Sequence, residues 1–350
     1  MKDTQIILSV VDLKKYYALQ KNAFFGKRQY LRANDGVSFQ IRRGETFALV
    51  GESGCGKSTL GKTILQLERP TDGSVFYYGE NGNAVDLAKL DEKQLRPMRR
   101  ELQIIFQDPY SSLNPRMTVG QIVGEGALVH GYYRKGTAAL QAFVLDIMQK
   151  CGLPPHTLNR YPHEFSGGQR QRVCIARALA LRPKFVVCDE CVSALDVSVQ
   201  SQILNLLAEL KEREKLTYLF ISHDLSVVRR ISDRLAVMYL GEIAETGDSE
   251  RVFKNPRHPY TIALMSAIPT LPSKKGVFKP RKQILLQGHM PSPVNPPSGC
   301  RFHTRCFMAQ DICRRIPAPH VEVEKGHFVA CHFADIPTAK KRELAFTKKE

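Results

Sequence analysis

A glycine-rich segment with a lysine and a hydroxyl at its end is the strongest chemical pattern in the chain. Residues 51–58 read Gly-Glu-Ser-Gly-Cys-Gly-Lys-Ser, between the apolar run Thr46–Val50 and the helix-like run Thr59–Leu67. The glycines allow a turn whose amides converge, and the following helix N-terminus adds its dipole, so the loop is suited to β- and γ-phosphates. Lys57 would supply charge to the same oxygens, and Ser58 a hydroxyl ligand to Mg²⁺. The candidate nucleotide-binding residues here are Gly51, Glu52, Ser53, Gly54, Cys55, Gly56, Lys57, Ser58 and Thr59. We interpret Cys55, at a variable position of this pattern, as a small filler rather than a nucleophile.

Two carboxylates follow a second apolar run. The sequence Phe185–Cys188 is followed directly by Asp189 and Glu190. Ligands of open α/β sheets bind at the carboxyl ends of the strands, so this placement favours catalysis over two ordinary surface acids. Asp189 would hold Mg²⁺, directly or through water, and Glu190 would orient and polarise the attacking water.

A second glycine pair stands before another helix-like run. Residues 165–172 read Phe-Ser-Gly-Gly-Gln-Arg-Gln-Arg and precede Val173–Leu181, which ends before Pro183. Small residues at a helix N-terminus again indicate an anion site. One chain needs one γ-phosphate site, so the second site suggests a nucleotide held by another subunit, and hence a dimer.

The surrounding elements indicate an α/β protein of two domains. Short apolar runs bounded by polar residues predict buried strands at Thr46–Val50, Leu102–Phe106, Phe185–Cys188 and Tyr218–Ile221. Helical spacing of apolar residues predicts helices at Ala138–Lys150 and Val199–Arg213. Nine of the twenty prolines lie between Pro256 and Pro297, after a helix-like stretch at Tyr260–Ile268, so we place a domain boundary there. The predicted domains are 1–265, with a helical part at about 108–180, and 266–350. The tail Lys340–Glu350 is predicted to be frayed and solvated.

Net charge and hydropathy say less about the function of the protein than the motifs do. The net charge of +17 is compatible with nucleic acid, an anionic membrane surface, a phosphorylated ligand or a solvated basic surface. The start of the chain has only a short apolar run, Ile6–Val11, well below the length of a secretion signal or membrane span. We therefore expect a cytosolic chain without a membrane span of its own.

Six motifs in order along residues 51–223 resemble the ABC ATPase superfamily. The loop at 51–58 and the acids at 189–190 are joined by the signature Ser166, Gly167, Gly168, Gln169, by Gln107 after a strand, by Ser193–Asp196, and by His223 after Tyr218–Ser222. The resemblance implies a P-loop NTPase ABC cassette, with a RecA-like core and antiparallel β and helical subdomains. It implies that Gln107 senses Mg²⁺ and the attacking water, that His223 touches the γ-phosphate and that Asp196 connects the two sites of a dimer. It also implies an aromatic residue stacked on adenine, for which Tyr17 is our candidate, with Tyr16 and Tyr30 behind it and an insertion-like stretch at 20–29 following it.

The sequence around these motifs resembles the ATPase subunits of oligopeptide and dipeptide permeases. It is carried by Phe106–Pro115, Tyr161–Gln169 and Val192–Gln200, whose form is similar to that of the F subunit. The resemblance implies ATP hydrolysis that energises peptide import at the cytoplasmic side of the membrane. The implied partners are a paralogous ATPase subunit forming a heterodimer, two permease subunits and, indirectly, an extracytoplasmic binding protein, with no nucleic acid. The segment Asp108–Gly120 is either a docking surface for a permease helix or a plain surface loop.

Two residues depart from the pattern of that family. Cys191 stands where proline usually follows the catalytic glutamate, and Cys174 where a small residue such as glycine is usual. Neither replacement removes a phosphate or metal contact. Cys191 restores a backbone donor and some freedom beside Glu190, so the rate of the reaction is in question more than its nature.

Four cysteines within residues 300–331 require an explanation. Cys300, Cys306, Cys313 and Cys331 follow the spacing C-x5-C-x6-C-x17-C, which lacks the tight pairs of most zinc sites. Some peptide-importer ATPases resembling this chain carry a [4Fe–4S] cluster in the C-terminal extension. We therefore predict an iron–sulfur cluster there, held by these four residues. Zinc and free thiols remain as alternatives.

Two alternatives to peptide import stay open. A soluble ABC ATPase acting on ribosomes or nucleic acid would suit the basic charge, although such proteins usually join two cassettes or insert long arms. The same transporter type also serves nickel, glutathione and antimicrobial peptides, and substrate identity lies mostly outside this chain.

Overall fold

The structure, a computed structural model, describes residues 6–19, 28–80, 82–268 and 282–347. Most of the predicted insertion at 20–29, the boundary residues 269–281 and the last three residues of the tail lie outside this range. The chain divides into two compact units. Unit 1 comprises residues 1–9, 40–46 and 76–222, and unit 2 comprises residues 10–39, 47–75 and 223–350. The strands β1 (Ile6–Ala18), β2 (Tyr30–Arg42) and β4 (Asp72–Tyr78) contribute residues to both.

Unit 1 is built on three parallel strands in the order β8-β7-β6. In register, Leu102 of β6 faces Phe185 of β7, and Phe185 faces Thr217 of β8. The unit contains β5 (Ala84–Asp86), η1 (Leu87–Lys89), α2 (Glu92–Met98), β6 (Leu102–Ile105), α3 (Pro109–Ser112), α4 (Val119–Val129), α5 (Ala138–Lys150), η2 (Pro155–Thr157), η3 (Pro162–Glu164), α6 (Gly167–Leu179), β7 (Phe185–Asp189), α7 (Val197–Glu214) and β8 (Thr217–Ser222). Since the strands are parallel, the residues that follow them gather at one edge of this part of the sheet.

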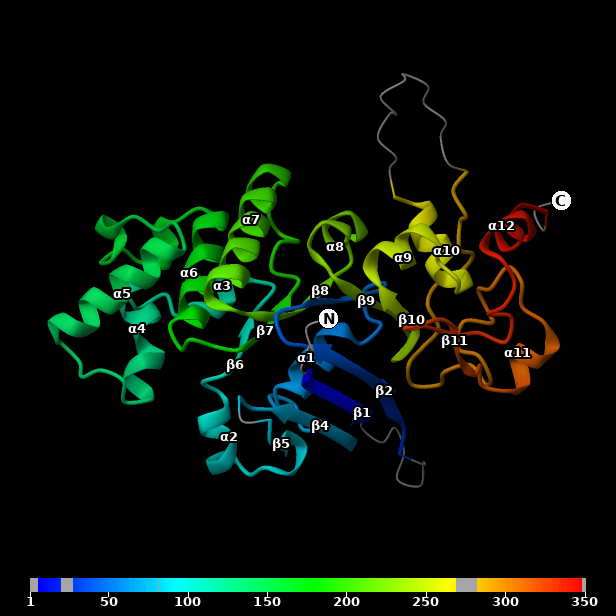
Figure 1. Ribbon diagram of the computed structural model, residues 1–350, viewed down its shortest axis with the longest axis horizontal. Helices are drawn as coiled ribbons and strands as arrows, with labels where there is room; N and C mark the ends of the chain where they lie inside the picture. Colours follow the sequence, from blue (N-terminus) through cyan, green and yellow to red (C-terminus); the bar gives the residue numbers. More distant parts are fainter. Residues whose placement is uncertain (1–5, 20–27, 81, 269–281, 348–350) are drawn as a thin grey trace, which may run out of the picture. The chain divides into compact units, whose positions relative to one another are not determined.

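A helical group lies beside these strands and carries the second glycine pair. Helices α3, α4 and α5 each contact α6, and α4 also contacts α5; Figure 1 draws the group from teal at α3 to green at α6. Polar caps fix where they start: Thr118 and Ser166 form capping boxes with Gln121 and Gln169, and Thr137 caps α5. Each helix buries an apolar face, which in α5 consists of Phe143, Val144, Ile147 and Met148.

Unit 2 contains five neighbouring strands in the order β11-β12-β10-β9-β3. Its elements besides the shared strands are β3 (Thr46–Val50, from Phe47 on), α1 (Lys57–Ile64), α8 (Leu225–Ile231), β9 (Arg234–Tyr239), β10 (Glu242–Asp248), α9 (Ser249–Lys254), α10 (Pro259–Ser266), α11 (Asp311–Arg315), β11 (His320–Glu324), β12 (His327–Ala330) and α12 (Thr338–Thr347). Strand β3 runs parallel to β9, and a two-residue turn, Leu240–Gly241, returns the chain into β10. The C-terminal strand β12 then pairs antiparallel with β10, with Glu245 opposite Val329. The last part of the chain thus extends the sheet that carries the glycine-rich loop.

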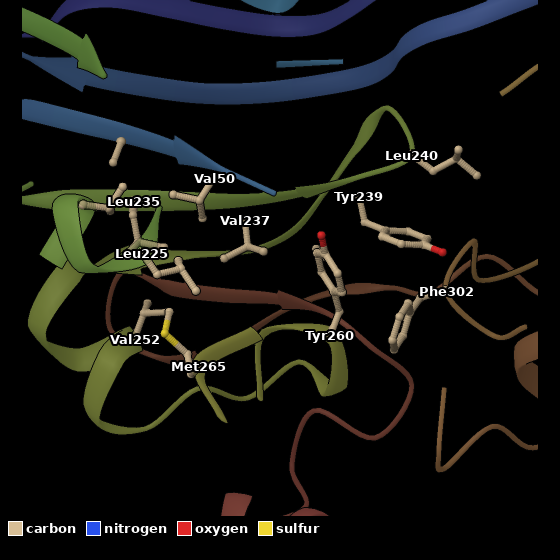
Figure 2. Packing of buried hydrophobic residues seen from close by; sticks show 13 residues of the cluster. Val50, Leu225, Leu235, Val237, Tyr239, Leu240, Val252, Tyr260, Met265 and Phe302 are labelled. Atoms are coloured by element: carbon tan, nitrogen blue, oxygen red, sulfur yellow. The ribbon is translucent and has the colours of Figure 1, made fainter. Parts of the chain in front are cut away.

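The core of unit 2 joins this sheet to the C-terminal part of the chain. Figure 2 shows Tyr239 of β9, Tyr260 of α10 and Phe302 facing one another beside aliphatic residues such as Val237 and Val252. The ring centroid of Tyr239 lies 4.8 Å from that of Tyr260 and 5.1 Å from that of Phe302, and both pairs are edge to face. Such aromatic pairs favour a defined geometry in addition to the area they bury.

The predicted elements correspond closely to the observed ones where the pattern is local. The four predicted strands are β3, β6, β7 and β8, and the helix predicted at 138–150 is α5 with the same bounds. In the part of the chain that the structure describes, no helix is both long and apolar enough to cross a membrane.

The prediction of a frayed tail is wrong for most of its length. Residues Thr338–Thr347 form α12, in which the buried Lys341 donates from Nζ to the carbonyl of Arg257. Ala345 packs in a small cluster with Ile262 and Ile284. The polar composition of the tail concealed these tertiary contacts.

Candidate functional site

The glycine-rich loop lies in unit 2 between the end of β3 and the start of α1. Gly56 has φ of 105° and precedes the first helical residue, Lys57. A Cβ at Gly56 would lie 2.1 Å from the carbonyl oxygen of Ala33, and the buried Asn34 donates to the carbonyl of Gly56 at 3.0 Å. Only glycine combines this left-handed conformation with so close an approach of another backbone. The loop is therefore held against β2 in one conformation.

The ammonium of Lys57 is enclosed by the loop. The residue is buried, and its Nζ donates to the carbonyls of Gly51 at 2.8 Å and Glu52 at 3.0 Å. Ser58 and Thr59 follow it in the first turn of α1, half-buried. A lysine beside the exposed amides of a helix N-terminus is the donor set that phosphate oxygens require. Cys55 is buried, and burial raises the pKa of its thiol, which fits a filler and not a nucleophile.

The C-terminal part of the chain also contacts this loop, which sequence analysis missed. The N–H of Glu52 donates to the hydroxyl of Tyr260 at 2.9 Å. Its carboxylate accepts from Nη1 of Arg305 at 2.9 and 3.1 Å. These partners are 208 and 253 residues away along the chain, and no spacing in the sequence could have indicated them.

In unit 1 the residues after β6 and β7 come together as their strand ends predict. Asp189 is the buried last residue of β7, and Glu190 follows with φ of 48° while its N–H donates to the carbonyl of Ile221. Gln107, after β6, donates from Nε2 to the Glu190 carboxylate at 3.0 Å. A left-handed conformation is unfavourable for glutamate, so the hydrogen bonds around it fix where its carboxylate points.

The two family departures lie within the packing of unit 1. Cys191 is buried directly after Glu190, and Cys174 places Sγ 3.3 Å from the hydroxyl of Ser112. Both thiols fill space in the interior and leave the Gln107–Glu190 contact intact.

The second glycine pair forms the start of α6. Ser166 caps the helix by accepting from Gln169 N–H at 3.4 Å, and Gln169 Oε1 accepts from Ser166 N–H at 3.0 Å. Ser166 and Gly167 are exposed, whereas Gly168 is buried against α7. Asp196 caps α7 through Val199 N–H at 3.0 Å, and this hydrogen bond lowers the pKa of its carboxyl. The exposed Gly167 at the start of α6 thus leaves its amide available to an anion outside the chain.

The remaining predicted site residues lie in unit 2. Tyr17, in β1, is half-buried, with its hydroxyl toward Thr59 and Glu68 and the Lys15 ammonium 4.7 Å from its ring centroid. Tyr16 is instead hydrogen-bonded to Asp35, and Tyr30 is exposed at the start of β2. The proximity to the helix of the glycine-rich loop favours Tyr17 among the three. His223 is exposed and follows β8.

The prediction of an iron–sulfur cluster is wrong. Among residues 6–19, 28–80, 82–268 and 282–347, no three His, Cys, Asp or Glu side chains are grouped so that they could hold a metal ion. Cys300 and Cys306 pack against the aromatic core of unit 2, whereas Cys331 packs with Val329 and Ala334 in another cluster. Burial raises the pKa of Cys300 to about 11 and that of Cys306 to about 12, as expected for thiols packed in an apolar interior. The cysteines, including Cys313, are free and act as small apolar residues.

Comparisons with known proteins agree with the motifs. Residues 34–193 match the profile of the ABC transporter family, and residues 244–313 match that of the oligopeptide/dipeptide transporter C-terminal region. The putative oligopeptide transport ATP-binding protein YkfD of Bacillus subtilis is 52% identical, over 93% of this chain and 95% of its own. The dipeptide transport ATP-binding protein DppF of Escherichia coli is 48% identical, over 95% of each chain.

Solved structures confirm the predicted cassette fold. The ATP-binding cassette MJ0796, in a dimeric post-hydrolysis state with ADP and Pi, has a TM-score of 0.60 and 28% identity, and the match covers 69% of this chain and 99% of that one. CbiO1 of Clostridium perfringens, part of the transporter complex cbiONQ, has a TM-score of 0.59 and 28% identity, over 71% and 91%. This chain belongs to the ABC transporter family, in its oligopeptide/dipeptide branch of ATP-binding subunits.

Proposed function

We propose that this protein binds and hydrolyses ATP and thereby energises a membrane importer of dipeptides or oligopeptides. One observation carries the proposal: a buried lysine is enclosed by a glycine-lined loop at a helix N-terminus, in a chain whose relatives are named for peptide transport. The loop supplies an anion site without further cofactors, which is the first requirement of an ATPase.

The residues have separate roles in this proposal. The loop amides and Lys57 bind the β- and γ-phosphates, and Tyr17 stacks on adenine. The hydroxyl of Ser58 and the carboxylate of Asp189 are hard oxygen ligands suited to Mg²⁺, which neutralises phosphate charge when bound. Glu190 accepts a proton from the attacking water, and Gln107, 3.0 Å from it, holds the carboxylate in place and responds to the same water. His223 contacts the γ-phosphate.

The proposal also includes a second subunit. The exposed Gly167 at the start of α6 would complete a nucleotide site on a partner through its amide, with Gly168 packed against α7, Ser166 and Gln169 holding the turn and Asp196 beside it. The partner is a paralogous ATPase subunit, two permease subunits span the membrane, and a binding protein delivers the peptide. Residues 108–120 would contact a permease at the cytoplasmic side, where Tyr110 is 68% exposed. The domains proposed remain 1–265 and 266–350.

A substitution at Glu190 tests the catalytic part of this proposal. Glu190→Gln should lower ATP turnover by about 10²- to 10⁴-fold, the usual range for loss of a general base, while ATP binding persists. ATP turnover is measured by phosphate release, and binding by equilibrium dialysis of radiolabelled ATP. Turnover at the wild-type rate would reject Glu190 as the base.

Uptake of a labelled dipeptide by the host cell tests the transport part. Disruption of the gene should abolish uptake, and the wild-type gene should restore it. The Glu190→Gln gene serves as the matched control, because it supplies a folded subunit without turnover. Restoration of uptake by that variant, or uptake unaffected by the disruption, would contradict the proposal.

A further inference from the structure

We infer that the C-terminal part of the chain positions the phosphate loop through Arg305 and Tyr260. Both residues hydrogen-bond to Glu52, and both are therefore positioning residues for ATP binding. The inference rests on the proposed function, since it assigns the loop its ligand. Both residues lie within 244–313, the region that matches the oligopeptide/dipeptide C-terminal profile.

The backbone N–H, the carbonyl and the carboxylate of Glu52 are all hydrogen-bonded. Its N–H donates to Tyr260, its carboxylate accepts twice from Arg305, and its carbonyl accepts from Lys57 Nζ at 3.0 Å. One residue therefore connects the lysine that binds phosphate to two side chains of the C-terminal part. A shift of Glu52 moves the carbonyl that holds the Lys57 ammonium.

The Arg305 side of this contact is a built site and not a surface ion pair. The Arg305 side chain is 8% exposed, and its guanidinium carbon lies 5.9 Å from the ring centroid of Tyr239. That ring contacts Tyr260, which is fully buried, and Phe302, so the aromatic cluster in Figure 2 fixes both partners of Glu52. Arg305 is thus packed on one side and donates two hydrogen bonds to the partly exposed Glu52 carboxylate on the other, so it fixes where that carboxylate lies.

Neighbouring contacts anchor the same segment to the sheet. Arg301 donates to the carbonyl of Leu240 and pairs with Asp35 and, at 2.7 Å, with Glu242. The next residue in that turn, Gly241, donates its N–H to the carbonyl of Cys55 in the loop at 3.0 Å. The segment that carries Arg305 therefore has a fixed distance to the loop, which a positioning contact requires.

The direction of the effect follows from where Lys57 acts. Lys57 would contact phosphate oxygens before and during hydrolysis, so a misplaced ammonium weakens both states alike. Such a loss raises KM and the Kd for ATP and leaves kcat nearly unchanged. This separates Arg305 from Glu190, whose loss lowers kcat.

The experiment is a double-mutant cycle in the full chain, with Arg305→Met and Glu52→Gln alone and together. The Kd for ATP is measured by equilibrium dialysis in the Glu190→Gln background, and KM and kcat in the wild-type background. We expect each single variant to raise Kd about tenfold, the order expected for loss of a charged hydrogen bond, and the double variant to raise it no further. Arg305→Lys should restore part of the affinity, because an ammonium can still donate to Glu52. Arg251→Met is the matched control: Arg251 donates to the carbonyl of Lys325, away from the loop, and its loss should leave Kd unchanged.

Unchanged Kd in both single variants, or additive effects in the double variant, would overturn the inference. If Arg305→Met fails to fold, the same cycle with Arg305→Lys decides. The proposed ATPase function is tested separately: it stands if the wild-type protein hydrolyses ATP and Glu190→Gln does not. Failure of the inference is therefore distinct from failure of the proposed function.

Discussion

The two glycines of the signature differ in what a side chain would meet, and this difference gives a sharp test of the packing of unit 1. A Cβ on Gly168 would lie 2.3 Å from Cγ1 of Val199 in α7, whereas a Cβ on Gly167 meets its nearest neighbour, Leu195 Cδ2, at 3.5 Å. Ordinary contacts begin near 3.4 Å, so Gly168→Ala requires about 1 Å of movement between α6 and α7. Val199 cannot rotate away easily, because a β-branched side chain in a helix has one strongly preferred rotamer.

The magnitude follows from two opposing effects. Overpacking in a close-packed interior costs about 1–3 kcal/mol. Replacing glycine by alanine in a helix stabilises by about 0.5–1 kcal/mol, and less in the first turn. Gly168→Ala should therefore lower the free energy of unfolding by about 1–2 kcal/mol, and Gly167→Ala should leave it unchanged or raise it by less than about 1 kcal/mol. In a chain of this size the first change lowers Tm by about 1–3 °C.

The assay is thermal unfolding of the full chain followed by circular dichroism, with Val199→Ala as the relieving substitution. The double variant Gly168→Ala/Val199→Ala should recover most of the stability that Gly168→Ala loses, since the truncated residue leaves room for the new methyl group. Equal Tm for the two glycine variants, or no recovery in the double variant, would refute the packing argument. ATP turnover should stay low in the double variant even with stability restored, because the added methyl group remains beside the exposed Gly167 at the start of α6.

Two further predictions concern unit 2. Tyr17→Ala should raise the Kd for ATP about tenfold, as loss of one base–aromatic stack costs about 1–3 kcal/mol, whereas Tyr17→Phe should stay within about twofold; equal effects of the two changes would remove Tyr17 from the adenine site. The second concerns His258, which caps α10 by accepting at Nδ1 from Tyr260 N–H at 3.1 Å. Burial and the nearby charge of Lys341 lower the pKa of His258 to about 3. The unfolded chain takes up a proton on this residue below pH 6.5 and the folded chain only near 3, so the stability from neutral His258 is complete above pH 6.5 and falls by about 1.4 kcal/mol per pH unit below it. His258→Asn keeps a cap acceptor without titrating, so Tm of the wild type should drop more steeply than that of the variant between pH 6.5 and 5.5, and parallel Tm curves would contradict this.

Elements set by adjacent residues could be predicted from the sequence. The strand, loop and helix around Lys57 are contiguous, so glycine placement and apolar runs sufficed to find β3 and α1, with the helix start displaced by two residues. The family resemblance gave Gln107 and Glu190 related roles, but their contact depends on β6 and β7 being neighbouring parallel strands that end at one edge, which the structure shows.

The cysteines show why composition misled. A thiol that ligates a metal and a thiol that fills a core have the same spacing in the sequence, and only the neighbours separate them. Cys306 lies against aromatic rings and Cys331 against aliphatic side chains, so burial raises the pKa of each thiol, and no group of ligands forms among the described residues.

The sequence by itself determined the family, the cassette fold and the local form of the phosphate loop, because those depend on backbone freedom and short-range periodicity. Only the tertiary structure shows which distant residues hold that loop in place. Tyr260 and Arg305 hydrogen-bond to Glu52 although each lies more than two hundred residues away in the sequence. Contacts of that range depend on how the strands and the C-terminal segment pack, and no local pattern of residues specifies that packing. A tyrosine and an arginine read in isolation carry no mark of that role.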